Sequence, residues 1–224
     1  MRATERRARL RGLYAITPDE PSLERLIARV AAAIDGGALL VQYRAKNLAA
    51  AQRAAQARAL VSLCRPRGVP LIVNDDPDLA VAVGADGVHL GRDDADPATV
   101  RRQLPEAIIG VSCYDQPALA RQAAAAGADY VGIGSLFPSG TKPRAVPASL
   151  SLLAQARAAG GLPVAGIGGI RPDNAASVVA AGADMIAVIG SLFDTPDVAR
   201  AARELSLTFA TDGSPHVRTQ PAAL

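Results

Sequence analysis

The sequence predicts a single-domain (β/α)8 TIM barrel of the α/β class, and three features of the chain support this prediction. Runs rich in Val, Ile and Leu alternate with Ala-rich helical patterns through eight cycles, which is typical of parallel strands buried on both faces. A Gly-Ala pair closes four of the helical patterns, at 37, 84, 127 and 182, where glycine readily adopts the left-handed conformation that ends a helix. Proline at 70, 105 and 163 precedes three of the strands, where it terminates the preceding helix. A doubly wound sheet of eight cycles is a less economical alternative.

These boundaries define the elements in order. Strands are predicted at about residues 13–17, 38–44, 70–74, 87–90, 107–112, 130–134, 163–167 and 185–189. Helices are predicted near residues 22–35, 48–66, 77–83, 97–103, 116–126, 148–159, 172–181 and 196–205. We expect residues 1–12 to form a basic N-terminal arm, either solvated or folded as a first helical turn. Residues 13–206 form the barrel in this prediction, and residues 207–224 form a disordered tail.

The composition disfavours several functional classes. Half of the 224 residues are hydrophobic, yet the chain contains no apolar run of transmembrane length and no signal-peptide pattern. The net charge of +3 is small and evenly spread, so neither nucleic acid nor membrane is expected as a partner. Two cysteines, Cys64 and Cys113, do not suggest a disulfide framework, and the cytoplasm is the default location. The sequence leaves the oligomeric state open, including a homo-oligomer.

Two of the predicted strands end in carboxylates. Asp75 follows the third strand and Asp94 follows the fourth, and in a barrel the chemistry lies where strands end. Carboxylates brought together on one edge repel each other unless a cation joins them. Oxygen ligands of this kind suit Mg²⁺, which takes one or two carboxylates together with water and substrate phosphates. The competing interpretation is helix capping, which we prefer for the neighbouring acids Asp76, Asp78 and Asp96.

Positively charged residues gather at the same end of the predicted barrel. Gln42, Arg44 and Lys46 alternate along the second strand and its exit, so their side chains share one side of the strand. Polar groups on a buried strand are costly unless they meet a polar ligand. Of the 24 basic residues only Lys46 and Lys142 are lysines, and both lie in strand-to-helix loops, where a compact ammonium differs from a guanidinium in what it can bind.

Glycine-rich turns follow the last two strands. The segments GIGGI at 166–170 and IGS at 189–191 present backbone N–H groups at two adjacent helix entrances, which is a common phosphate site in such barrels. Simple tight turns are the alternative. One phosphate near strands 7 and 8 and a metal-bound polyphosphate near strands 2 to 4 indicate two phosphorylated substrates, or one long one.

Six ordered segments resemble the thiamine-phosphate synthase family. They are VQYRAK (41–46), VND (73–75), GVHLGRDD (87–94), GVS (110–112), FPSGTK (137–142) and GIGGI (166–170). Each motif alone is weak, but six in order cover most of the predicted barrel. The resemblance implies a (β/α)8 enzyme of thiamine biosynthesis that joins a pyrimidine methyl diphosphate to a thiazole phosphate, with Mg²⁺, and that releases diphosphate.

The resemblance also implies roles for particular residues. Asp75 and Asp94 would hold Mg²⁺, and Lys142, Arg44 and Ser112 would act on the reacting groups. The pyrimidine diphosphate would contact Gln42, Tyr43, Arg44, Ala45, Lys46, Asn74, Ser112 and Lys142. The thiazole phosphate would contact Ser139, Gly140, Thr141, Gly169, Ile189 and Gly190.

Some residues depart from the family pattern. Tyr114 stands where a His is common, the loop after Lys142 is short, and Gly190 stands where Ser is frequent. His89 is interpreted as a satisfied core residue. Two alternatives stay open: a thiazole tautomerase of the same fold, and a barrel that binds a phosphate ligand without catalysis. Tautomerases typically lack the second acid and use the His that Tyr114 replaces, so Asp94 and Tyr114 both favour the synthase.

Overall fold

The computed structural model describes residues 3–139 and 148–210 and contains a closed barrel of eight parallel strands. Each strand pairs with the next along the chain, and β8 pairs with β1 to close the ring. The predicted fold is therefore confirmed, and a doubly wound open sheet is excluded. The strands are β1 (Gly12–Ile16), β2 (Ala38–Tyr43), β3 (Leu71–Asn74), β4 (Gly87–Leu90), β5 (Ile108–Tyr114), β6 (Tyr130–Ile133), β7 (Val164–Ile167) and β8 (Met185–Val188).

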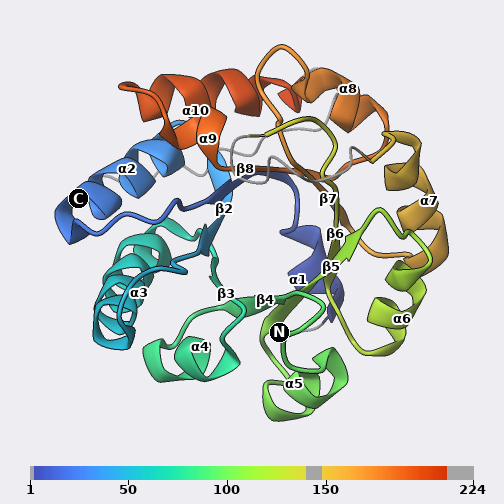
Figure 1. Ribbon diagram of the computed structural model, residues 1–224, viewed down its shortest axis with the longest axis horizontal. Helices are drawn as coiled ribbons and strands as arrows, with labels where there is room; N and C mark the ends of the chain where they lie inside the picture. Colours follow the sequence, from blue (N-terminus) through green and yellow to red (C-terminus); the bar gives the residue numbers. More distant parts are fainter. Residues whose placement is uncertain (1–2, 140–147, 211–224) are drawn as a thin grey trace.

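Helices form an outer ring around the strands, as Figure 1 shows. Each predicted helix is present; those predicted at 77–83 and 97–103 have these bounds, and several others are shorter because their ends fold as turns. The ring contains α2 (Leu23–Asp35), α3 (Ala50–Cys64), the 3₁₀ turn η1 (Arg65–Arg67), α4 (Pro77–Val83), α5 (Pro97–Gln103), α6 (Leu119–Ala125), α7 (Ser151–Gly160), α8 (Ala175–Ala180), the short α9 (Gly190–Phe193) and α10 (Val198–Leu207). Among the described residues, none of the helices has the length and apolar character that crossing a membrane requires.

The core has two layers, because side chains alternate between the two faces of each strand. The larger layer joins the outward faces of the strands to the helices and includes Leu26, Leu60 and Leu153. The smaller layer fills the barrel interior and contains Tyr14, Tyr130 and other residues of alternating strand positions. This packed interior closes the barrel, so that ligands can enter only at its ends.

The recurring Gly-Ala-Asp segments have a structural role that the sequence pattern did not reveal. The four glycines at 37, 84, 127 and 182 all have positive φ, as predicted for helix ends. The aspartates that follow three of them, Asp86, Asp129 and Asp184, accept hydrogen bonds from the backbone N–H groups of Leu71, Ile109 and Val164 respectively. Each of these acids thus fixes the start of the preceding strand at the amino end of the barrel, away from the strand ends where we expect chemistry.

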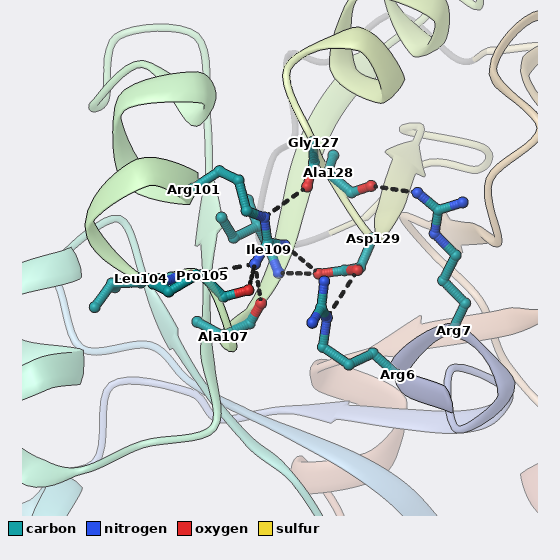
Figure 2. Close-up of polar contacts among 10 residues, drawn as sticks. All are labelled: Arg6, Arg7, Arg101, Leu104, Pro105, Ala107, Ile109, Gly127, Ala128 and Asp129. Atoms are coloured by element: carbon teal, nitrogen blue, oxygen red, sulfur yellow. Dashed lines mark hydrogen bonds and ion pairs between the residues drawn. The ribbon is translucent and has the colours of Figure 1, made fainter. Parts of the chain in front are cut away.

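The N-terminal segment is not only a solvated arm in the structure. Residues Ala3–Ala8 form helix α1, which lies inside the ring of helices near β5 and β6 (Figure 1). Arg6 is 6% exposed, and its Nε atom lies 3.0 Å from Oδ1 of the buried Asp129. Figure 2 shows Arg6 and Arg101 meeting this carboxylate from two sides. Burial of a paired arginine was not predicted, because a basic terminal segment is usually solvated.

Candidate active site

A cavity of about 720 Å³ opens at the carboxyl ends of the strands. All eight strands or their exits contribute to its lining, and this matches the expected location of chemistry in a barrel. Predicted site residues supply much of the wall: Gln42, Arg44, Asn74, Ser112, Ser139, Gly169, Ile189 and Gly190. Gly140, Thr141 and Lys142, which were also predicted, lie outside the described residues.

The exit of β2 divides its residues between the cavity and the helix layer. Gln42 and Arg44 line the cavity, as the alternation predicted. The intervening Tyr43 is 2% exposed and donates a hydrogen bond from its hydroxyl to Gln56 Oε1 of α3 at 2.9 Å. Ala45 packs against the same outer core. The side chains of Tyr43 and Ala45 are therefore turned away from the cavity, and any substrate contact they make is through the backbone.

Thr17 holds the β2 exit in place. Its hydroxyl oxygen accepts a hydrogen bond from the Arg44 N–H at 2.9 Å, and the hydroxyl donates to the Arg44 carbonyl oxygen at 3.1 Å. The fully buried Thr17 follows directly after β1. The backbone from which the Arg44 guanidinium extends is thus anchored to the neighbouring strand.

Asp75 and Asp94 come together at the rim, as predicted. The two side chains are within hydrogen-bonding range of each other, and Lys46 Nζ lies 3.2 Å from Asp75 Oδ2. Partial burial raises the pKa of Asp94 above its ordinary value, and the nearby Asp75 carboxylate acts in the same direction. The Gly91 N–H, which donates to Asp94 Oδ2 at 2.6 Å, opposes this shift. Two carboxylates that face each other suit a cation between them.

The donor set at this rim fits magnesium. Among the described residues, no group of three or more His, Cys, Asp or Glu side chains is arranged to hold a metal ion. A complete protein cage, of the kind that structural zinc requires, is thus not found there. Two carboxylates beside a cavity with cationic walls match Mg²⁺, which usually keeps several waters and binds substrate phosphates.

Two of the three neighbouring acids, Asp76 and Asp96, are helix caps as we preferred from the sequence, whereas Asp78 lies inside the first turn of α4 and is not the cap. Asp76 accepts a hydrogen bond from the Leu79 N–H at the start of α4. Asp96 does the same for the Thr99 N–H at the start of α5. Each caps a first-turn donor that has no partner within the helix. The capping interpretation is therefore confirmed for Asp76 and Asp96.

A chain of polar side chains crosses the cavity floor, and sequence reasoning missed most of it. We call it the floor network; it consists of Tyr14, Gln42, His89, Ser112 and Tyr130. Gln42 Nε2 lies 2.7 Å from the Tyr14 hydroxyl, which lies 2.7 Å from the Tyr130 hydroxyl. His89 bridges the other end, with Nδ1 2.9 Å from the Tyr130 hydroxyl and Nε2 2.9 Å from Ser112 Oγ. One signal was available: tyrosine is rare in this chain, with four in all, and three of them, Tyr14, Tyr43 and Tyr130, stand in predicted strands.

The turns after β7 and β8 form the opposite wall of the cavity. Gly168 has φ +103° and Gly169 has φ +61°, and a Cβ atom on Gly169 would lie 2.4 Å from the carbonyl oxygen of Pro138. Only glycine fits this close approach in this conformation. The Ser191 hydroxyl, which donates to the Ile170 carbonyl oxygen at 2.5 Å, ties the two turns together. Ser135, Ser191 and Asp194 also line this wall and were not predicted as site residues.

Tyr114 lies at the rim of the cavity, at the end of β5. The structure extends β5 to Tyr114, two residues beyond the predicted end, through a bulge between Ser112 and Tyr114. Its φ of +55° is left-handed, and its side chain lines the cavity. The hydroxyl oxygen accepts a hydrogen bond from the Arg92 N–H at 2.9 Å, and the Arg92 guanidinium lies 4.7 Å from the ring centroid. A bulge re-aims a side chain in this way, and no simple alternation pattern predicts it.

Comparison with known proteins identifies the family. A family model described as thiamine monophosphate synthase matches residues 13–192. The chain belongs to the thiamine monophosphate synthase family. Thiamine-phosphate synthase of Thiobacillus denitrificans is 55% identical over 202 residues, covering 90% of this chain and 96% of that protein. The enzyme of the same name from Chromobacterium violaceum is 57% identical over 199 residues, covering 88% and 96% respectively.

Solved structures agree with this assignment. A thiamine phosphate pyrophosphorylase from Pyrococcus furiosus has a TM-score of 0.81 and 36% identity, covering 92% of this chain and 98% of that one. A 3-hexulose-6-phosphate synthase has a TM-score of 0.65 at 20% identity, which shows a shared fold alone. Membership of the thiamine monophosphate synthase family confirms the resemblance drawn from the sequence motifs, and with it a transferase of thiamine biosynthesis. The matched region contains every predicted site residue; the individual residue roles stay predictions.

Proposed function

We propose that the chain transfers a 4-amino-2-methylpyrimidin-5-ylmethyl group from its diphosphate to the nitrogen of a thiazole phosphate, with or without a carboxylate, and releases diphosphate. One observation carries the proposal: a single cavity joins two regions suited to anions. Arg44, with Lys46 at the nearby rim, forms one region, and the glycine turns after β7 and β8 form the other. Two phosphorylated small molecules are thus the proposed partners, and each has its own end of the site.

The pyrimidine diphosphate occupies the β2–β5 side in this proposal. Gln42, Arg44, Asn74 and Ser112 line that part of the cavity, while Lys46 stands at the rim beside Asp75. Lys142 joins them by the family resemblance. These groups bind the diphosphate by charge and by hydrogen bonds, and such contacts strengthen as negative charge develops on the leaving group.

Asp75 and Asp94 hold Mg²⁺ in this proposal. When bound, the ion neutralises the negative charge of the departing diphosphate. The chain's own contribution is geometric: the Gly91 N–H fixes Asp94, and Lys46 compensates the charge of Asp75. These contacts place the two carboxylates beside each other at the rim.

The thiazole phosphate occupies the β7–β8 side, where Ser139, Gly169, Ile189 and Gly190 line the cavity. The bond between the methylene carbon and the diphosphate oxygen breaks, and the electron-rich aminopyrimidine stabilises the methylene cation. The thiazole nitrogen then bonds to that carbon. No side chain acts as a nucleophile, and Ser112 binds substrate without attacking it, so positioning and electrostatics supply the rate.

A thiazole tautomerase of the same fold is the second candidate function. It differs in needing no metal and no second substrate. The facing pair of Asp75 and Asp94 is surplus for that reaction, and also for a barrel that only binds phosphate. Tyr114 at the rim replaces the His that the tautomerase uses, so the rim as a whole favours the synthase.

The deciding experiment is a two-substrate assay of diphosphate release. We expect release only when the pyrimidine diphosphate, the thiazole phosphate and Mg²⁺ are all present. Absence of release with all three would disprove the proposed function. Aromatisation of a thiazole carboxylate without metal would instead establish the tautomerase.

We place this reaction in the cytoplasm. Cys64 and Cys113 are both free and buried, which fits a compartment without disulfide formation. Detection of the full-length protein in a cell fraction other than the cytosol would contradict this location.

A further inference from the structure

The direction of the hydrogen bonds in the floor network follows from the number of hydrogens each group carries. The Gln42 amide nitrogen is a donor only, and it points to the Tyr14 hydroxyl oxygen at 2.7 Å. Tyr14 therefore accepts from Gln42, and its single hydrogen needs another acceptor. The Tyr130 hydroxyl oxygen, 2.7 Å away, is the acceptor at hand. If Tyr130 donated to Tyr14 instead, the buried Tyr14 hydrogen would lose its partner, at the cost of an unmade hydrogen bond.

Counting hydrogens in the same way gives the tautomer of His89. Tyr130 accepts from Tyr14, so its own hydrogen points to His89 Nδ1, 2.9 Å away. A nitrogen that accepts carries no hydrogen, so the neutral imidazole carries its hydrogen on Nε2. Nε2 lies 2.9 Å from Ser112 Oγ and thus donates to it. Because the Ser112 oxygen accepts this bond, its own hydroxyl hydrogen points elsewhere, to the cavity that Ser112 lines.

The surroundings keep this arrangement in one state. Tyr14 is 1% and Tyr130 0% exposed, and burial raises the pKa of both phenols above their ordinary value. Both hydroxyls therefore keep their hydrogens across the working pH range. Gly110 of β5 makes room for the bridge, since a Cβ atom there would lie 2.1 Å from Tyr130 Cζ. The Tyr130 ring thus lies across β5 and reaches His89 on β4.

We propose that His89 is a positioning residue, held by Tyr130 in the tautomer with hydrogen on Nε2, which turns the Ser112 hydroxyl into a hydrogen-bond donor facing the pyrimidine diphosphate. This inference rests on the proposed function for the identity of the ligand. The tautomer and the direction of the bonds do not depend on it. His89 thus acts on the reaction through Ser112, although it was interpreted from the sequence only as a satisfied core residue.

The tautomer can be measured without any substrate. The chain has two histidines, His89 and His216, so a His216→Gln variant leaves one imidazole for ¹⁵N NMR. At a pH where the ring is neutral, we expect the Nε2 resonance to be that of a protonated nitrogen and the Nδ1 resonance that of an unprotonated one. In a Tyr130→Phe background, which lacks the hydroxyl that donates to Nδ1, we expect both tautomers of the neutral ring to be populated. A neutral ring with hydrogen on Nδ1 in the parent overturns the proposal, because the Gln42 amide and every bond of the network would then point the other way.

Binding tests whether Tyr130 and His89 act through Ser112. With Mg²⁺ present, Tyr130→Phe and Ser112→Ala should each weaken binding of the pyrimidine diphosphate roughly tenfold, the effect of about one hydrogen bond. The double variant should bind no more weakly than Ser112→Ala alone, since the two changes remove the same interaction. Additive losses, or equal losses for the thiazole phosphate, overturn the proposal because they indicate general loosening of the barrel.

Conservative replacement separates positioning from packing. His89→Gln supplies an amide N–H that can reach Ser112, so this variant should keep most of the parent's affinity for the pyrimidine diphosphate. His89→Leu has no such donor and should lose that affinity. Cys113→Ala is the matched control on β5, because Cys113 is buried in the outer core and should change stability without changing either binding constant. Equal affinity of the His89→Leu and His89→Gln variants for the pyrimidine diphosphate contradicts the proposal. If the parent protein releases no diphosphate, the proposed function fails, while the tautomer measurement still decides the direction of the network.

Discussion

At the scale of single residues, Asp94 has both the hydrogen bond of a loop cap and the position that we propose for a metal ligand, which the sequence presented as alternatives. Its Oδ2 atom accepts the Gly91 N–H at 2.6 Å, so it holds the loop after β4. It also faces Asp75, and burial together with that neighbour raises its pKa. A purely capping carboxylate such as Asp96 has the opposite tendency, because bonds to Thr99 lower its pKa. The rim position of Asp94 thus favours cation binding over simple capping.

The substitution Asp94→Asn separates these two tasks. The amide oxygen of the substituted side chain can still accept from the Gly91 N–H, while the charge needed for Mg²⁺ is lost. We expect the midpoint of urea unfolding to change little and diphosphate release to fall by about two orders of magnitude or more. Asp96→Ala, the matched cap variant, should lose about 1 kcal/mol of stability and keep its turnover. Unchanged turnover in Asp94→Asn would show that Asp94 is only a loop cap.

The scarcity of lysine gives a second prediction at this scale, which concerns Lys142. Lys142→Arg should lower turnover, because a planar guanidinium does not replace a compact ammonium at a crowded phosphate. Steady-state assays with both substrates measure this effect. Arg121→Lys, at an exposed position of α6, is the control and should be neutral. Full activity of Lys142→Arg would mean that the scarcity of lysine reflects composition alone.

At the scale of elements, helix α1 is attached to the barrel by charge, through its buried residue Arg6. Asp129, which precedes β6, is 1% exposed and meets Arg6 Nε at 3.0 Å and an Arg101 terminal nitrogen at 2.5 Å. It also accepts the Ile109 N–H of β5. Arg101 in turn donates to the carbonyl oxygens of Gly127, Leu104, Pro105 and Ala107, all drawn in Figure 2. A helix from one end of the chain is thereby tied to the amino end of the barrel at β5 and β6.

Removing Arg6 should be costly for this reason. Arg6→Ala leaves the buried Asp129 short of one charge partner, and we expect a loss of about 3 kcal/mol in the free energy of unfolding. Arg7→Ala is the matched control, since Arg7 donates to the Ala128 carbonyl oxygen and should cost less than about 1 kcal/mol. Urea denaturation of both variants measures the difference. Equal losses would show that α1 contributes through its backbone position and not through this ion pair.

At the scale of the whole molecule, the buried ionisable groups make the fold sensitive to alkali. Burial raises the pKa of both Cys64 and Cys113 from about 9 to about 12, and that of Tyr43 from about 10 to about 12. These groups lie in α3, β5 and β2, so the effect is spread over the barrel. In each case the folded state keeps a proton that the unfolded state releases at lower pH.

Stability should therefore fall with rising pH in a defined window. Below pH 9 the stabilisation from the two protonated thiols is fully present, and it is lost as the pH rises from about 9 through about 12. The loss is at most about 1.4 kcal/mol per pH unit for each thiol. Urea midpoints at pH 8, 9.5 and 10.5 measure the slope, and Cys64→Ala should flatten it. A midpoint that does not change between pH 8 and pH 10.5 would contradict the expected burial of these thiols.

The fold and the outline of the site could be predicted from the sequence, but the directions of several side chains could not. The repeated glycines and the apolar runs predicted every strand of the barrel, because both signals are local. Tyr43 shows where a motif alone falls short: it lies within VQYRAK, yet its side chain points to Gln56. The bulge that turns Tyr114 to the cavity and the ion pair that buries Arg6 depend on partners far along the chain, so no local pattern predicts them.

By itself, the sequence predicted the barrel, the end at which the cavity opens, the family, and the pairing of Asp75 with Asp94. The barrel and the pairing of the two carboxylates follow from strand periodicity and from the rule that parallel strands bring their carboxyl ends to one edge. The family followed from the resemblance of six ordered motifs and was confirmed by comparison. Only the tertiary structure decided that Tyr14, Gln42, His89, Ser112 and Tyr130 form one hydrogen-bonded network. The reason is physical: closing the ring brings β1 and β2 within reach of β4, β5 and β6 across a narrow interior. Hydrogen bonds across that space depend on barrel closure, a property of the folded chain and of no segment of it.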